Sequence, residues 1–117
     1  MYLFYEHELK KLLIHMGITP NYKGYGYIVS AMRIIFEEPD CLQHVTKELY
    51  PEIAKSYQTD WRAVERSIRI ALLRSWDKES EKFQKLFGLW EKEPPSVAKF
   101  LSILYMYFLL EYEEKAI

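Results

Sequence analysis

The sequence predicts an all-α protein, a single-domain bundle of six helices. Three observations support this prediction. Apolar residues recur three and four positions apart in several segments, a spacing that places them on one side of a helix. The four glycines and five prolines fall where these segments would begin or end. No stretch of four or more residues alternates strictly between apolar and polar side chains, so we expect no strand.

Length and composition limit the class of protein. With 117 residues, half of them apolar, the chain can bury one core but not two of ordinary size, so residues 1–117 are expected to form one domain. Cys41 is the single cysteine, which excludes an internal disulfide and suits a reducing cytoplasm. The most apolar run, residues 100–110, is far shorter than the roughly 20 residues that span a bilayer. We therefore expect a cytoplasmic protein that does not contact a membrane.

The first two predicted helices cover residues 4–16 and 24–37. Gly17 would end the first, and Pro39 lies just beyond the end of the second. The apolar residues that share a side are Leu9, Leu12, Leu13 and Met16 in the first helix and Ile28, Ala31, Met32 and Ile35 in the second.

Residues 46–57 form the next predicted helix, in which Pro51 either starts a fresh helix or kinks the existing one. After a short connection, Thr59 or Asp60 can cap a long helix that runs to about residue 76. Two more helices are expected at residues 79–87, closed by Gly88, and at residues 96–112, opened by two prolines and a serine.

The long helix has two contrasting sides on a helical wheel of about 100° per residue. One side is mostly apolar and faces inward. The opposite side gathers charged residues within an arc of roughly 100°, and Leu73 follows them in the last turns of the helix. The inward residues are Trp61, Val64, Ile68, Ala71, Leu72 and Ser75, and the outward ones are Arg62, Glu65, Arg66 and Arg69.

The segment in front of this helix completes a recognisable layout. Ile53, Ala54 and Tyr57 form the apolar edge of a short helix, and about four residues link it to the long one. Ala54 is small where two helices must cross closely. This is the layout of a helix-turn-helix, about residues 46–76, whose second helix, about residues 60–76, enters the DNA major groove.

Arginine and glutamate on such a helix can recognise bases. Arginine donates two hydrogen bonds to guanine O6 and N7, and glutamate accepts from cytosine N4. Between residues 55 and 74 five basic residues stand against two acidic ones, so this patch is positive although the whole chain carries a formal charge of −1. The predicted base-reading residues are Glu65, Arg66 and Arg69, and the predicted phosphate-binding residues are Lys55, Thr59, Arg62 and Arg74.

A simpler interpretation of the charged face stays open. The same spacing is typical of an ordinary solvated helix face with i,i+3 and i,i+4 ion pairs. The turn also lacks the usual glycine and has Gln58 in its place. The pattern alone favours this simpler interpretation.

Several segments resemble a known family. The two most specific are Thr46-Lys47-Glu48-Leu49-Tyr50-Pro51-Glu52-Ile53-Ala54-Lys55 and Val64-Glu65-Arg66-Ser67-Ile68-Arg69. Ile14-His15-Met16-Gly17-Ile18, Lys23-Gly24-Tyr25 and Leu86-Phe87-Gly88 recur in the same order. Together they resemble the C-terminal DNA-binding effector domain of the sporulation response regulator stage 0 sporulation protein A.

The resemblance implies a six-helix domain that regulates transcription by binding double-stranded DNA, often as tandem protomers. Glu65, Arg66 and Arg69 fall on family DNA-reading positions. The sequence departs from the family at Ala63, where an arginine is usual, and at Ile70, where a histidine is usual. Full-length members carry a receiver domain in front, and this chain is either a cut effector domain or a receiverless relative.

Other kinds of site find little support. Cys41 and His44 are spaced i,i+3, but no second pair at zinc-site spacing accompanies them, so we expect no metal. No nucleophile, base and orienting acid occur together, and no glycine-rich phosphate loop follows a strand, so we expect no enzyme and no cofactor.

The last predicted helix is apolar around almost its whole circumference. Such a helix is usually buried on several sides, and the alternative is that one side forms a homodimer contact, or a contact between tandem protomers on DNA. A second hypothesis for the whole chain is a protein-interaction module that has lost DNA specificity. The net charge, Ile70 and the acidic Glu111, Glu113 and Glu114 motivate it.

Overall fold

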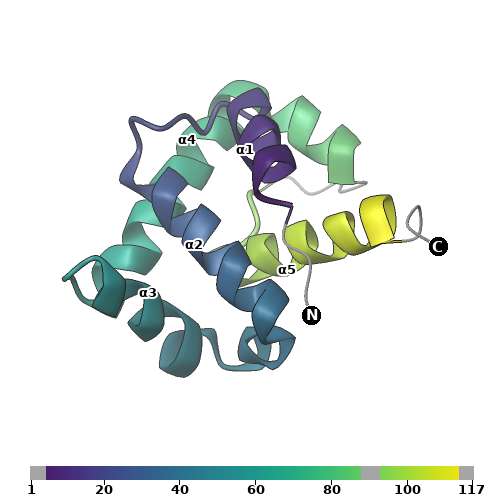
Figure 1. Cartoon of the computed structure of the whole chain (residues 1–117). Coiled ribbons are helices and arrows are strands. Elements are labelled where there is room, and N and C mark those ends of the chain that lie inside the picture. Colours follow the sequence, from purple (N-terminus) through teal and green to yellow (C-terminus); the bar gives the residue numbers. More distant parts are fainter. Residues whose placement is uncertain (1–4, 88–92, 114–117) are drawn as a thin grey trace.

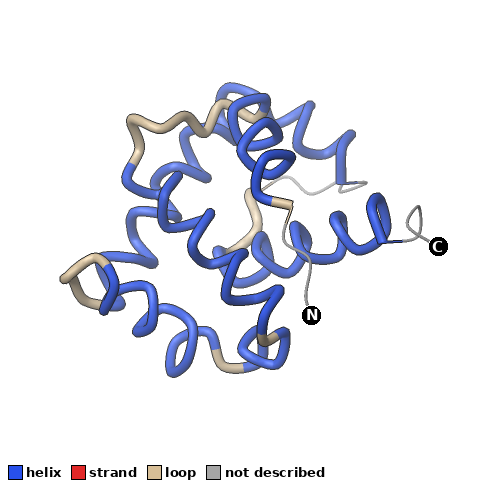
Figure 2. The backbone as a smooth tube through the Cα atoms, viewed as in Figure 1, coloured by secondary structure: helices blue, strands red, loops and turns tan. Residues whose placement is uncertain are grey.

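The computed structural model describes the backbone of residues 5–87 and 93–113 and the side chains of residues 5–76 and 93–112. Within these ranges the chain forms five α-helices and no strand (Figures 1 and 2), which confirms the all-α prediction. They are α1 (Glu6–His15), α2 (Lys23–Glu37), α3 (Tyr50–Ser56), α4 (Trp61–Phe87) and α5 (Val97–Phe108). Shorter helical turns occur at Pro39–Gln43 (3₁₀), Val45–Leu49 (π) and Leu109–Glu113 (π).

The predicted number of six helices was wrong, because residues 79–87 do not form a helix of their own. Helix α4 runs without interruption through the 27 residues from Trp61 to Phe87. These residues include neither glycine nor proline, so nothing in the backbone chemistry ends the helix after Trp76. The helix end predicted at Gly88 lies outside the described residues.

The predicted helix ends elsewhere agree with the structure. Pro51 lies in the first turn of α3, where its missing N–H costs no hydrogen bond, so it starts a fresh helix. At the start of α5, the Ser96 hydroxyl oxygen accepts a hydrogen bond from the Lys99 N–H at 3.2 Å. Gly17 ends α1 with a left-handed φ of 87°.

Helix α2 is the centre of the bundle and contacts all four other α-helices (Figure 1). Most of its side chains are therefore buried, which explains why apolar residues dominate its sequence. The buried apolar side chains of all five helices join in one hydrophobic core.

Gly24 sets how closely α2 approaches α4. A Cβ atom at this position would lie 2.5 Å from the Ser67 carbonyl oxygen and 3.0 Å from the Ile68 Cα atom. Both are backbone atoms, which cannot rotate away as a side chain can. Only glycine therefore allows α4 to pack against α2 at this distance, and the position of α4 in the bundle depends on it.

Candidate nucleic-acid interface

The connection between α3 and α4 reverses the chain in four residues. The Thr59 N–H donates to the Ala54 carbonyl at 3.0 Å and the Gln58 N–H to the Lys55 carbonyl at 3.5 Å, which is the Schellman pattern of a helix end. Gln58 adopts the left-handed φ of 56° that this pattern requires, although it is not a glycine. A carboxylate oxygen of Asp60 accepts from the Ala63 N–H at 2.9 Å and caps α4.

Helix α3 braces the start of α4 with its own apolar side. Ile53 and Ala54 are buried, as predicted. Tyr57 differs from the prediction of an apolar edge, because its side chain is 47% exposed. Its ring packs edge-on against Tyr27 with centroids 4.9 Å apart, and its hydroxyl lies 3.0 Å from the Ser30 hydroxyl. Both contacts tie the end of α3 to α2.

The predicted inward side of α4 is confirmed. Its five central members are almost completely buried, whereas Trp61 is half-buried against the core. The one polar member is satisfied inside its own helix, since the Ser75 hydroxyl donates to the Leu72 carbonyl at 3.0 Å. The buried residues are Val64, Ile68, Ala71, Leu72 and Ser75.

The opposite side of α4 presents its charges to solvent. Arg62, Arg66 and Arg69 are exposed, and Glu65 is half-buried. The Arg69 Nε donates to Glu65 Oε1 at 2.9 Å, so the ion-pair interpretation of the sequence is confirmed for this i,i+4 pair. The Arg62 guanidinium lies 5.2 Å from the centre of the Trp61 ring. Arg66 forms no ion pair with any side chain in the described ranges.

The model of the sporulation initiation factor Spo0A C-terminal family matches residues 9–108 of this sequence. The chain belongs to this family. The family consists of DNA-binding effector domains of sporulation regulators, so the chain is a DNA-binding domain of a transcription regulator. The matched range runs from within α1 to the last residue of α5 and includes the whole of α3, the turn and the described part of α4.

Within this Spo0A C-terminal domain the four predicted phosphate-binding residues are spread along the α3–α4 unit. Lys55 is exposed in the last turn of α3, Thr59 is half-buried in the turn, and Arg62 is exposed in the first turn of α4. Arg74 is exposed about 18 Å further along the helix axis than Arg62. The structure thus brings three of them to the turn and leaves Arg74 apart.

Tyr50 is a residue of this unit that the sequence patterns did not single out. It is buried at the start of α3, and burial raises the pKa of its hydroxyl to about 12, with a further contribution from the nearby carboxylate of Glu65. The side chain therefore stays neutral at physiological pH. Only its place in the family-like segment could have indicated a role.

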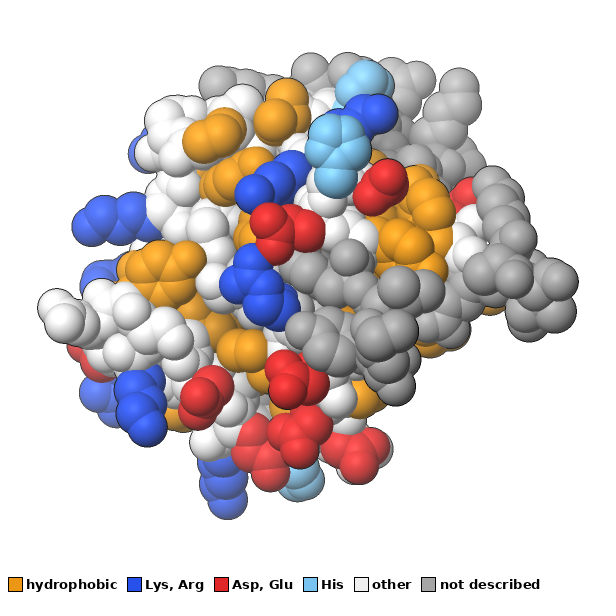
Figure 3. All heavy atoms as spheres, in the orientation of Figure 1, with side chains coloured by type: hydrophobic (Ala, Val, Ile, Leu, Met, Phe, Trp, Pro, Cys, Tyr) orange, Lys and Arg blue, Asp and Glu red, His pale blue; other side chains and the backbone are white. Residues whose placement is uncertain are grey.

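Charge is separated on the surface, which reconciles the net charge with a positive α4. Acidic side chains gather at the lower edge of the view in Figure 3, whereas several basic ones lie along the left edge, where Figure 1 shows α3 and α4. A hollow at the acidic edge is lined by Glu37, Glu38, Asp40, Glu48 and Glu52, among others. A formal charge of −1 is thus compatible with a cationic helix face.

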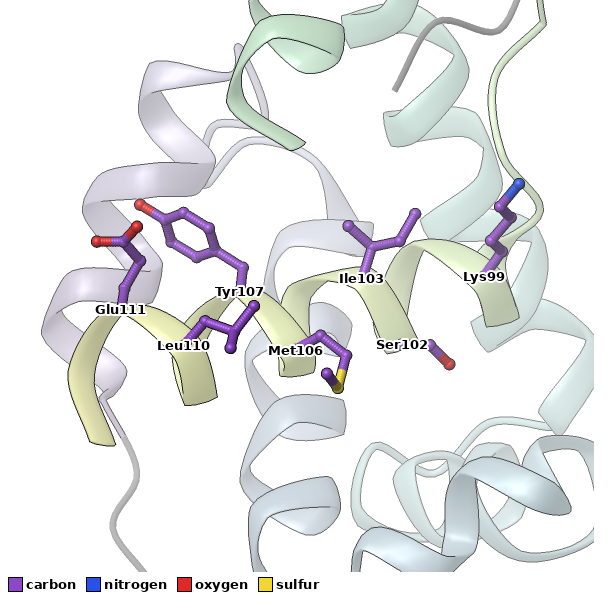
Figure 4. Close-up of a pocket in the computed structure, with 7 residues that line it drawn as sticks. All are labelled: Lys99, Ser102, Ile103, Met106, Tyr107, Leu110 and Glu111. Carbon is purple, nitrogen blue, oxygen red and sulfur yellow. The ribbon is translucent and has the colours of Figure 1, made fainter. Parts of the chain in front are cut away.

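The exposed side of α5 and of the π-helical turn that follows it, Leu109–Glu113, forms a shallow groove of a different character. Ile103, Met106 and Leu110 line it, with Lys99 towards one end and Glu111 at the other (Figure 4). Met106 and Leu110 are 51% and 55% exposed. The fully buried residues of α5 thus lie on one side of the helix, whereas burial on several sides was the favoured expectation.

Cys41 was the only candidate nucleophile named from the sequence together with a histidine partner. Cys41 is buried, and burial raises the pKa of its thiol to about 11, so it is a poor nucleophile at neutral pH. Among the described residues no three histidine, cysteine or acidic side chains come together as metal ligands would. In the same part of the chain, no helix combines the length and the apolar character that a membrane span requires.

Proposed function

We propose that the domain binds duplex DNA sequence-specifically and regulates transcription, with residues 46–76 acting as a helix-turn-helix. In this proposal the first half of α4, residues 60–76, lies in the major groove, and α3 crosses behind it. One observation carries the proposal. A single helix is fixed in the core by six buried residues, Trp76 included, while three guanidinium groups leave its opposite side.

Arg66, Arg69 and Glu65 are the proposed base-reading residues. The ion pair between Glu65 and Arg69 is compatible with this role. It occupies Nε of Arg69, and the two terminal Nη groups can still donate side by side to guanine O6 and N7. Each carboxylate oxygen has two lone pairs, so Glu65 can accept from cytosine N4 while it holds Arg69 in position.

Lys55, Thr59, Arg62 and Arg74 are the proposed phosphate contacts, which set the register of the helix on the duplex without reading sequence. Three of them surround the α3–α4 turn, where a helix-turn-helix passes the DNA backbone. The proposal places the protein with the DNA, in the cytoplasm or nucleoid.

The test is binding to labelled duplexes selected from a random pool, at two salt concentrations. The substitutions Arg66→Ala and Arg69→Ala should each weaken binding to the selected sequence by about 1–3 kcal/mol. Both variants should bind scrambled DNA nearly as tightly as the parent protein does. Lys55→Ala should weaken binding to all sequences alike and reduce the salt dependence. Equal losses on selected and scrambled DNA for Arg66→Ala would contradict base reading.

A second candidate function is a protein contact through α5, which the exposed Met106 and Leu110 favour. We propose that two protomers meet through this groove, as a homodimer or as tandem protomers on adjacent DNA sites. Sedimentation velocity with and without a two-site duplex tests it. Met106→Ser with Leu110→Ser should abolish cooperative binding and leave single-site affinity unchanged. If the oligomeric state is the same with and without DNA, the result would instead support the hypothesis that the chain is a protein-interaction module.

A further inference from the structure

Two large apolar side chains are exposed on the charged side of α4. Ile70 and Leu73 are each 40% exposed, whereas the apolar residues on the inward side, such as Val64 and Ile68, are fully buried. The core therefore does not explain why these two positions are apolar.

The two side chains share the direction of Arg66. At about 100° per residue, Arg66, Ile70 and Leu73 fall within roughly 60° of one another and opposite the buried Val64 and Ile68. Ile70 follows Arg66 by about 6 Å along the helix axis, and a base-pair step along the duplex is about 3.4 Å. A surface that Arg66 contacts therefore also meets Ile70 within about two base pairs.

The chemistry of the major groove leaves one partner for an apolar side chain there. Base edges in this groove carry hydrogen-bond donors and acceptors, and the only apolar group among them is the C5-methyl of thymine. Ile70 can neither donate nor accept a hydrogen bond. Pressed against a polar base edge, it would displace water without replacing its hydrogen bonds, which costs free energy.

We propose that Ile70, with Leu73 beside it, determines specificity by packing against the methyl group of a thymine next to the guanine read by Arg66. The inference rests on the proposed function, because it requires the first half of α4 to lie in the major groove. The contact would recognise the base by shape and apolar surface and would involve no hydrogen bond.

The experiment exchanges single thymines for deoxyuridine in the selected duplex, which removes only the methyl group. The parent protein should lose roughly fourfold in affinity at one thymine, the effect of one buried methyl-sized group. Ile70→Ala should bind the thymine and uracil duplexes equally. The guanine read by Arg66 is located by 7-deazaguanine, to which Arg66→Ala should be insensitive because the substitution removes the N7 acceptor.

Ile14→Ala is the matched control, since Ile14 is 50% exposed on a different helix, α1. This variant should keep the full response to uracil. If the parent protein binds the selected duplex but its affinity does not change at any uracil exchange, the inference is overturned and the proposed function is not. The same holds if Ile70→Ala loses as much affinity as the parent does when thymine is replaced by uracil. Failure of the parent to select any duplex would overturn the proposed function and the inference with it.

Discussion

Helices α4 and α5 both bury one side in the same core and both contact α2, yet the exposed side of α4 is mainly cationic and that of α5 mainly apolar. The exposed side of α4 carries Arg62, Arg66 and Arg69, and that of α5 with the turn after it carries Met106 and Leu110. Burial of one side is enough to fix a helix in a bundle. The composition of the other side is then free to suit a partner, which is DNA for α4 and an apolar protein surface for α5 under the functions proposed above.

The buried sides of the two helices are also built differently. Helix α5 fills the core with large side chains, of which Phe100 and Phe108 are almost completely buried. Helix α4 instead approaches the backbone of α2 so closely at Gly24 that a single added carbon would collide. The position of α5 thus depends on the volume of its buried side chains. The close approach of α4 depends on the missing side chain of Gly24 in α2.

The largest expected effect is a loss of stability when a buried side chain of α5 is truncated. Phe100→Ala should lower the free energy of unfolding by about 3–5 kcal/mol, because it removes a buried ring and leaves a cavity. Urea denaturation followed by far-ultraviolet circular dichroism measures the loss. Met106→Ala, on the exposed side of the same helix, should change stability by no more than about 0.5 kcal/mol. Similar losses in both variants would show that the two sides of α5 do not differ.

Close packing against α4 is tested by the next largest effect. Gly24→Ala should lower the free energy of unfolding by about 1–3 kcal/mol, because the backbone of α4 must move. The control is Gly26→Ala in the same helix, where the nearest atom to an added Cβ is the Tyr57 hydroxyl at 3.4 Å. That variant should gain about 0.5–1 kcal/mol from the loss of glycine flexibility. If both variants change the free energy of unfolding in the same direction, the result would argue against a close approach of α2 and α4 at Gly24.

Alkaline pH tests the burial of Tyr50 at the start of α3. The folded-state pKa of Tyr50, about 12, is higher than the usual tyrosine value of about 10, so the unfolded chain loses this proton first. Stability is therefore fully present below about pH 10 and falls as pH rises towards 12, by about 1.4 kcal/mol at pH 11. Tyr50→Phe should remove this part of the fall, as measured by urea denaturation at pH 9 and pH 11. An identical fall in both proteins would contradict the shift.

The smallest expected effect lies in the turn before α4. Gln58→Gly should raise the free energy of unfolding by about 0.5–1 kcal/mol, because a side chain in the left-handed conformation costs more than the flexibility of glycine. The reverse exchange at the end of α1, Gly17→Gln, should lower stability by a similar amount. Thermal melting of both variants checks the pair. A loss of stability in Gln58→Gly would mean that the Gln58 side chain contributes a contact of its own.

Helix positions were largely predictable because they depend on local chemistry. The apolar spacing of α2, the proline in the first turn of α3 and the serine cap of α5 each act within one or two turns of chain. The inward side of α4 was correct for the same reason, since a helical wheel needs only sequence and periodicity. The same wheel places Ile70 outward next to Arg66, so this candidate could have been found from the sequence.

By itself, the sequence determined where the helices form and which side of α4 is charged, because both follow from spacing along one chain segment. It did not determine that residues 61–87 form one helix rather than two, or that Gln58 takes the conformation usually given to glycine. Only the tertiary structure decided the close contact at Gly24 and the exposure of one side of α5. These depend on how segments far apart in sequence settle against each other in space.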